Sequence, residues 1–395
     1  MLNSHLPQDA HTALLIGRLW VPEAGAHVVA VTPQDVFDLS ELASTSSALL
    51  ELPDVATRVQ DFVNSGLAPV LCSTDQALDN SLHAQHKPDA PWFMAPCDLQ
   101  AVKAAGVTFV ASMLERVIEE QARGDASRAE AVRQAVVAVI GDNLRSVVPG
   151  SAQAAQLKQV LLSQGMWSQY LEVGIGPDAE IFTKSQPMSA VGSGAWVGIH
   201  PASQWNNPEP EIVLATNSRG QVVGATLGND VNLRDFEGRS ALLLGKAKDN
   251  NASCAIGPFI RLFDAQFGIE DVRQCELRLE VQGPEGFVMQ GSSSLSQISR
   301  DPLDLVHQAM GPYHQYPDGM VLFLGTMFAP TQDRHGPGQG FTHVVGDVVS
   351  VSTPKLGTLV NTVTTSDLAP PWTYGVQALM RDLASRPLAH RSDKR

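Results

Sequence analysis

Short apolar runs separated by turn residues dominate the second half of the chain. Between about residue 180 and residue 363, runs typical of β-strands alternate with Gly, Pro, Asn and Asp, a spacing that is typical of antiparallel sheets. The runs are AWVGIH, EIVLAT, QVVGATLG, CELRLEVQG, MVLFLGTM and GDVVSVS. The pattern therefore predicts a mostly antiparallel β architecture, interrupted by a helix at DPLDLVHQAMG and followed by one at WTYGVQALMRDLAS.

The first half of the chain carries two different patterns. Residues from about 12 to 98 mix short apolar runs with one helical stretch near ELPDVATRVQDFVNSG, which predicts a small α+β unit. From Asp98 to about residue 165, apolar residues recur at helical spacing, and we interpret the Arg and Glu side chains among them as a solvated helix face. We therefore expect an N-terminal domain at 1–98 and a larger domain at 99–390, with a helical insertion at about 116–165.

Composition narrows the class of protein. The chain has 395 residues, of which 44% are hydrophobic and 17% charged, as in ordinary globular proteins. The net charge is −14 and no run of Lys or Arg exceeds two residues, so nucleic acid and anionic membranes are not expected as partners. We recognise no signal peptide and no apolar stretch of the about 20 residues that span a membrane. The four cysteines form no CxxC pair, which predicts reduced thiols in a cytoplasmic protein.

Two glutamates one residue apart, Glu209 and Glu211, stand among prolines at the start of an apolar run. Glutamate is a poor strand former, and like charges at this spacing repel each other. An exposed acidic strand edge, which discourages aggregation, is one explanation for the pair. A bound cation that offsets the repulsion is the other.

A hairpin over residues 208–235 would bring a third carboxylate to the same face. With a loop at 217–220, Glu209 faces Gly228 and lies diagonal to Asp230. Because side chains alternate with a period of two, both glutamates and Asp230 then project from one face, whereas a one-residue slip would send Asp230 to the other. Three carboxylates without a nearby His or Cys form an all-oxygen ligand set that suits Mg²⁺, Mn²⁺ or Ca²⁺ rather than zinc.

The segments PEPEIV, GATLGNDVNLRD and KAKDNNASCAIGPFI closely resemble the fumarylacetoacetate hydrolase superfamily. The signature of that superfamily is an E-x-E pair, then N-D-V-x-x-R-D, then a lysine before C-x-I-G-P, and EIFTK, VLFLGTM and GDVVSVSTPKLGTLVN match further segments in order. The resemblance covers roughly Asp98 to Val363. It implies an α+β, mostly β fold, a mixed β-sandwich roll around a divalent cation, usually Mg²⁺, in a homodimer or larger homo-oligomer. The metal ligands would be Glu209, Glu211 and Asp230.

The same resemblance implies roles for four further residues. Lys248 matches the active-site lysine, which stabilises an enolate or moves a proton, and a partly dry site is expected to depress the pKa of its ammonium group toward neutrality. Thr326 matches the threonine that binds the substrate carboxylate. Arg234 of the N-D-V-x-x-R-D segment and Lys184 of EIFTK are expected to bind substrate. Ordinary ion pairs and strand-end caps are alternative interpretations of these residues.

A departure from the superfamily pattern lies upstream. The hydrolases carry G-x-N-Y-x-x-H-x-x-E, whose His and Glu activate water for C–C bond cleavage. In the matching segment GVTFVASMLE, Glu115 is retained, but Ser112 replaces the histidine and Phe109 replaces the tyrosine. Serine cannot act as the base that histidine provides near neutral pH. Hydrolysis by the usual route is therefore not expected.

The segments AGVTF, EIFTK and CAIGP are most similar to the sugar-acid dehydratase branch. This implies a dehydratase that converts a 2-keto-3-deoxy-D-pentonate, a small 2-oxo sugar acid derived from D-arabinonate or D-xylonate, to 2-oxoglutarate semialdehyde through a metal-stabilised enolate. Elimination needs a base at C3 and an acid for the C4 hydroxyl, but no water nucleophile. We expect Glu115 and Lys248 to be catalytic, and Ser112 and Phe109 to contact the substrate.

The alternative function is a hydrolase of 2,4-diketo acids. In that case Glu115 orients water alone, or a histidine of the Gly-rich segment DRHGPGQGFTH, either His335 or His343, substitutes for the missing one. The segment would then act as a lid over the site. A purely structural role for either histidine is equally consistent with the sequence.

Overall fold

A computed structural model describes residues 5–83, 86–123, 125–140, 147–163, 165, 167–328 and 330–386. Within these residues the strands form an 11-stranded sheet, here the large sheet, a five-stranded small sheet and a two-stranded ribbon. The large sheet has the order β4 (Val70–Ser73), β3 (Asp35–Asp38), β2 (Gly25–Val31), β1 (Leu15–Val21), β13 (Cys254–Leu262), β11 (Val222–Asp230), β10 (Pro210–Thr216), β16 (Met320–Phe323), β6 (Ala101–Gly106) and β7 (Glu180–Ser185), with β5 (Trp92–Met94) paired to β1.

The small sheet, the two-stranded ribbon and the helices are the remaining elements around the large sheet. The small sheet has the order β15 (Val288–Ser294), β14 (Glu276–Gln282), β17 (Val348–Thr353), β18 (Gly357–Thr365) and β8 (Trp196–Ile199), and the ribbon pairs β9 (Asn206–Asn207) with β12 (Asn232–Leu233). The α-helices are α1 (Ser46–Leu50), α2 (Val55–Asn64), α3 (Thr74–Ser81), α4 (Val110–Ala122), α5 (Ala126–Ile140), α6 (Ala152–Ser163), α7 (Gln169–Ile175), α8 (Arg234–Glu237), α9 (Leu244–Lys248), α10 (Ile269–Arg273), α11 (Pro302–Ala309) and α12 (Val376–Ser385).

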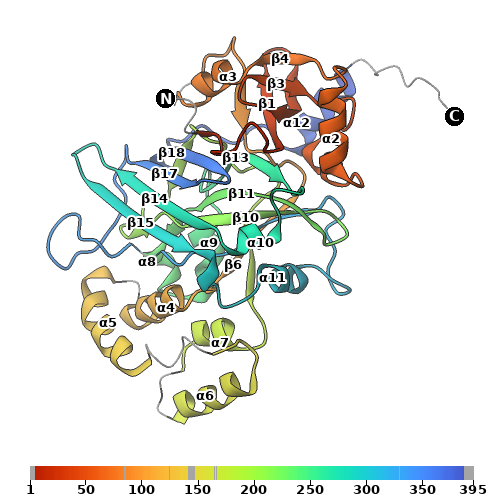
Figure 1. Cartoon of the computed structure of the whole chain (residues 1–395). Coiled ribbons are helices and arrows are strands. Elements are labelled where there is room, and N and C mark those ends of the chain that lie inside the picture. Colours follow the sequence, from red (N-terminus) through yellow and green to blue (C-terminus); the bar gives the residue numbers. More distant parts are fainter. Residues whose placement is uncertain are drawn as a thin grey trace.

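The main hydrophobic core lies between the two sheets. Ile212, Leu214 and Leu227 of the large sheet share one buried cluster with Leu279 and Val351 of the small sheet. The opposite face of β10 is covered as well, since all seven of its residues are buried. Figure 1 shows α4 to α7 grouped at one end of the molecule and the N-terminal strands with α12 at the other. The predicted α+β, mostly β class, with packed mixed sheets, is confirmed.

The hairpin of β10 and β11 forms with a register that differs from the predicted one. Glu211 pairs with Gly228 and not with Thr226. The loop runs one residue further than predicted, because the Asn217 N–H donates to the Gln221 carbonyl, and a bulge beside the loop adds a second offset. The two offsets add to a shift of two residues, so every side chain keeps its predicted face.

The start of the predicted helical region is wrong. Residues 101–106 form strand β6, which pairs parallel to β16. Val102 and Ala104 of β6 are buried in the sheet. The run AVKAAG has little strand propensity of its own, so the neighbouring strand rather than local preference selects this conformation.

Three predicted helices, α2, α11 and α12, are confirmed. The sequence encodes the start of α11 directly, because the Asp301 side chain accepts the Leu303 N–H and Pro302 occupies a first-turn position that needs no N–H partner. Among the described residues, no helix has both the length and the apolar character needed to cross a membrane.

The N-terminal strands belong to the large sheet, because β1 pairs antiparallel with β13. Arg261 of β13 is fully buried and binds both carboxylate oxygens of Asp9, at 2.7 and 3.0 Å. Backbone and side-chain hydrogen bonds thus join the two parts of the chain. The domain boundary at residue 98 stays a prediction.

The close packing of Gly228 yields a stability test. A Cβ at this position would lie 2.2 Å from the Phe323 ring and 2.6 Å from Val213. We expect Gly228→Ala to lower the free energy of unfolding by about 1–3 kcal/mol through overpacking, measured by urea unfolding. Gly245→Ala is the matched control, since nothing lies within 4 Å of its added Cβ. Equal losses in both variants would contradict the packing argument.

Candidate metal centre and active site

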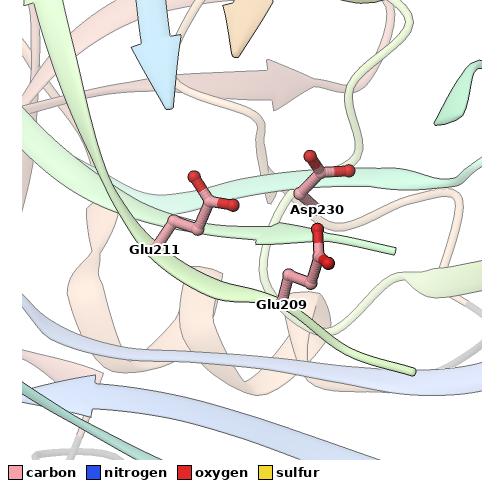
Figure 2. Close-up of side chains that lie close together, drawn as sticks. All are labelled: Glu209, Glu211 and Asp230. Atoms are coloured by element: carbon pink, nitrogen blue, oxygen red, sulfur yellow. The ribbon is translucent and has the colours of Figure 1, made fainter. Parts of the chain in front are cut away.

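Three buried carboxylates converge where β10 begins and β11 ends (Figure 2). Glu209 precedes β10, Glu211 lies within it and Asp230 ends β11, and one ligand oxygen from each lies within 4.8 Å of the others. All three are buried, with exposed fractions of 5%, 2% and 1%. The Asp230 N–H donates to the Glu209 carbonyl at 3.0 Å, so these two residues are direct cross-strand neighbours rather than the predicted diagonal pair. Convergent carboxylate oxygens fit a hard divalent cation.

Glu211 is held by the loop after β16. Its Oε2 accepts the Gly325 N–H at 2.6 Å. The φ of Gly325 is 87°, a left-handed conformation that favours glycine. Burial, followed by the charges of Asp230 and Glu209, raises the pKa of the Glu211 carboxyl group well above its ordinary value. Thr326 follows directly and is buried, and its hydroxyl accepts the N–H two residues on at 3.0 Å.

Two buried lysines bind the same carboxylates. Lys248, at the end of α9, donates to Glu209 at 2.5 Å and to Asp230 at 3.1 Å. Lys184 of β7 lies 2.9 Å from the other oxygen of Asp230 and donates to the Val231 carbonyl at 3.2 Å. Asp230 is therefore clamped between two ammonium groups. The predicted contact of Lys184 with substrate stays a prediction.

The pKa of Lys248 shifts in the opposite direction to the one expected from the sequence. Burial lowers it, but the charges of Asp230 and Glu209 outweigh burial and raise it above its ordinary value. The expected depression toward neutrality is therefore wrong, because the lysine is surrounded by carboxylates. Burial of Glu209 is likewise outweighed by Lys248 and Arg116, which lower its pKa to about 2.

One face of α4 adds a buried charge network that the sequence interpretation missed. Arg116 binds Glu209, Glu119 at 2.6 Å and Glu237 at 3.0 Å. Glu119 also binds Arg234 at 2.6 Å. Arg116 and Glu119 are 8% and 1% exposed, so the predicted solvated helix face is wrong for this stretch. Their spacing of three residues was the available signal, since residues at that spacing share a helix face.

Glu115, Ser112 and Phe109 lie along the start of the same helix. Glu115 binds Arg133 with both oxygens, at 3.0 and 2.7 Å, and Arg234 at 3.2 Å. Ser112 is half-buried and shares the face of Glu115 by its spacing. Phe109 precedes the helix and is 1% exposed within the main core. The structure thus connects Glu115 to the carboxylate triad through the arginines and glutamates of the network, whereas Phe109 packs in the core.

A cavity of about 260 Å³ adjoins Arg234 and is walled in part by the segment 330–341. His335 in this segment is exposed. His343, just beyond it, is buried, and its Nδ1 lies 2.8 Å from Asp347. His343 therefore has a structural partner, which agrees with the second of the two interpretations of this residue.

Glu180, the first residue of β7, is a further titratable group near the triad. Its Oε2 would lie 2.0 Å from a Cβ at Gly106, so the glycine makes room for this carboxyl group. Burial, and then the charge of Glu237, raises the pKa of Glu180 to about 7. The residue opens the EIFTK segment, which was the signal that the sequence offered for it.

The clamp on Asp230 predicts a large loss of stability when Lys184 is removed. We expect Lys184→Met to lower the free energy of unfolding by about 3–5 kcal/mol, because a buried carboxylate loses a charged partner. Urea unfolding of metal-free protein measures the change. Lys103→Met on the neighbouring strand β6 is the control, since Lys103 bonds to Thr183 at the surface. Similar small losses in both variants would contradict the clamp.

The raised pKa of Glu180 predicts a dependence of stability on pH. The unfolded chain releases this proton at about pH 4.3 and the folded chain near pH 7, so the native state binds more protons between these values and its stability falls as pH rises through them. We expect Glu180→Gln in EDTA to stabilise the chain at pH 8 relative to the unaltered protein and to change little at pH 4, as measured by thermal unfolding. The exposed Glu276→Gln is the control. If the melting temperature of the Glu180 variant depends on pH in the same way as that of the unaltered protein, the raised pKa of Glu180 is contradicted.

Comparison with known proteins supports the resemblance that the sequence motifs indicate. Residues 172–364 match the family model described as fumarylacetoacetate (FAA) hydrolase, C-terminal. A probable 2-keto-3-deoxyxylonate dehydratase of Haloferax volcanii is 30% identical over 196 residues, which cover 50% of this chain and 64% of the relative. A 2-dehydro-3-deoxy-D-arabinonate dehydratase of Saccharolobus solfataricus is 28% identical over 184 residues, covering 47% of this chain and 58% of the relative. Each match spans less than two thirds of the relative.

The fold is shared over a longer stretch. The structure of a 2-keto-3-deoxy-D-arabinonate dehydratase complexed with magnesium and 2,5-dioxopentanoate superposes with a TM-score of 0.60 over 89% of this chain and 99% of that chain, at 19% identity. The triad and its lysines lie within residues 172–364, as do Arg234 and Glu237 of the network, whereas Arg116 and Glu119 precede that segment. Over residues 172–364, just under half of this chain, the sequence is similar to the fumarylacetoacetate hydrolase family.

Proposed function

We propose that the chain is a divalent-metal-dependent dehydratase that converts a 2-keto-3-deoxy-D-pentonate to 2-oxoglutarate semialdehyde, which is 2,5-dioxopentanoate. The observation that carries the proposal is the convergence of three buried carboxylates beside Lys248 in a segment that is similar to this family. The names of both relatives, each a dehydratase of a 2-keto-3-deoxy-pentonate, support the choice of reaction.

Glu209, Glu211 and Asp230 are the proposed metal ligands. Their oxygens fit Mg²⁺, and Mn²⁺ or Ca²⁺ are compatible with the same donor set. When bound, such an ion supplies a Lewis acid that polarises a 2-oxo acid and makes its C3 protons more acidic. Glu209 and Asp230 already bind ammonium groups, so the protein itself offsets part of the negative charge of the ligand set.

Lys248 and two carboxyl groups are the proposed reactive groups of the chain. The raised pKa of Lys248 keeps it cationic, which suits stabilisation of negative charge on the substrate better than proton abstraction. Glu115 is the proposed proton carrier, although two guanidinium groups bind it, so proton uptake requires one of these contacts to open. Glu180, with a pKa of about 7, is the second candidate because it exchanges its proton near neutral pH.

The absence of a histidine at residue 112 favours elimination over hydrolysis. Ser112 cannot serve as the base that prepares a water nucleophile near neutral pH. His343 is paired with Asp347 in the core, which leaves only the exposed His335 on the Gly-rich segment as a substitute among the described histidines of that segment. Dehydration by elimination needs neither a histidine at residue 112 nor a substitute from the Gly-rich segment.

Turnover of a defined sugar acid tests the proposal. We expect the full chain with Mg²⁺ to form 2-oxoglutarate semialdehyde from 2-keto-3-deoxy-D-arabinonate, followed through a coupled semialdehyde dehydrogenase, and to lose this activity in EDTA. Glu209→Gln is expected to lower kcat/KM by about 100-fold, since it removes a charged ligand. Glu276→Gln, on the exposed face of β14, is the control.

The opposing result is equally specific. If the sugar acid is unchanged while a 2,4-diketo acid is cleaved to pyruvate, the chain is a hydrolase. Both activities should also be measured in Ser112→His, which restores the residue of the hydrolase pattern. A homo-oligomer and a cytoplasmic location remain predictions, and light scattering of the purified chain checks the first.

A further inference from the structure

The metal-ligand hairpin continues beyond the triad as a ladder of two asparagines. Asn207 of β9 pairs with Asn232 of β12, in the same register that pairs Glu211 with Gly228. Because side chains on one face recur every second residue, Asn207 and Asn232 project from the same face as the carboxylates. They lie one step along the ladder, about 7 Å from Glu209 and Asp230 by strand geometry.

These two side chains have unused hydrogen-bonding capacity. Asn232 is fully buried, and neither its Oδ1 nor its Nδ2 has a partner in the described part of the chain. Asn207 is 3% exposed, and its Nδ2 donates to the Pro208 carbonyl at 2.9 Å, but its Oδ1 is also without a partner there. Buried polar groups in native proteins are nearly always bonded, so three such atoms side by side indicate a missing polar partner.

The adjacent asparagine, Asn206, has hydrogen-bond partners for both of its side-chain polar atoms. Asn206 is equally buried, yet its Oδ1 accepts the His343 N–H at 3.1 Å and its Nδ2 donates to Ser203 at 3.1 Å. Its side chain projects from the opposite face of the ribbon. Within the two-stranded ribbon, the amide atoms without a partner are therefore those of Asn207 and Asn232.

The atoms that lack partners define what they would bind. They comprise two amide oxygens and one amide nitrogen, all uncharged, so a carboxylate or phosphate is not favoured. An alcohol hydroxyl donates one hydrogen bond and can accept another, so one hydroxyl satisfies one amide oxygen and the amide nitrogen, and a second hydroxyl can satisfy the other oxygen. A 2-keto-3-deoxy-pentonate anchored at the triad through its 2-oxo acid end extends hydroxyl groups at C4 and C5 away from the metal ligands.

We propose that Asn207 and Asn232 form a hydroxyl-binding pocket that receives the C4 or C5 hydroxyl of the substrate and selects sugar acids over plain 2-oxo acids. The inference rests on the proposed function. It assigns the specificity for a hydroxylated chain to the outer end of the same hairpin that carries the metal ligands.

Asn232→Leu tests the pocket, because leucine has a similar volume and no polar atoms. We expect KM for 2-keto-3-deoxy-D-arabinonate to rise about tenfold, while the inhibition constant of 2-oxopentanoate, which has the same chain length and no hydroxyl, is unchanged. The melting temperature of the free protein should stay the same or rise, because the variant removes two of the three buried amide atoms that lack a partner. Asn232→Thr, which keeps one donor and acceptor, should recover part of the affinity.

Asn217→Leu is the matched control at the other end of the hairpin. The Asn217 side chain bonds to Arg219 and Gln221 in the turn, so this variant should lower the melting temperature and leave KM unchanged. If Asn232→Leu behaves in the same way, the amides are structural and the pocket is disproved. If the unaltered chain dehydrates no sugar acid, the proposed function fails and the pocket fails with it.

Discussion

Three carboxylates buried within reach of one another repel strongly, and burial increases that repulsion because little water remains to screen it. Three cations from separate elements offset this repulsion: Lys184 from β7, Lys248 from α9 and Arg116 from α4. Each cation is useful only if its element packs at the correct place. The charge balance of the triad therefore ties the large sheet, the α9 segment and the helical region into one structure.

The sequence predicted the triad correctly although the predicted hairpin register was wrong. The hairpin register was wrong by two residues, but an even shift leaves the faces of a strand unchanged, so Glu209, Glu211 and Asp230 still met. The pattern of short apolar runs likewise predicted the sheets. Both inferences depend on local periodicity, which a single sequence displays.

Contacts between distant segments were not predictable in the same way. Arg116 and Glu119 resemble the surface charges of any helix until tertiary packing buries them against Glu209 and Arg234. Strand β6 has weak local preference and is selected by its neighbour. The direction of the Lys248 pKa shift also depends on which carboxylates surround it, and burial alone indicates the opposite direction. These features depend on three-dimensional neighbours that no spacing rule encodes.

The recognisable family segment and the folding unit do not coincide. Residues 172–364 carry the family match, yet within the large sheet β13 is flanked by β1 and β16 by β6, and both flanking strands lie outside that segment. A fragment trimmed to the matched residues would present two bare sheet edges, which are templates for intermolecular pairing. It would also leave the Arg261 guanidinium without Asp9. For this architecture, the extent of sequence similarity is a poor guide to where a recombinant fragment can be cut.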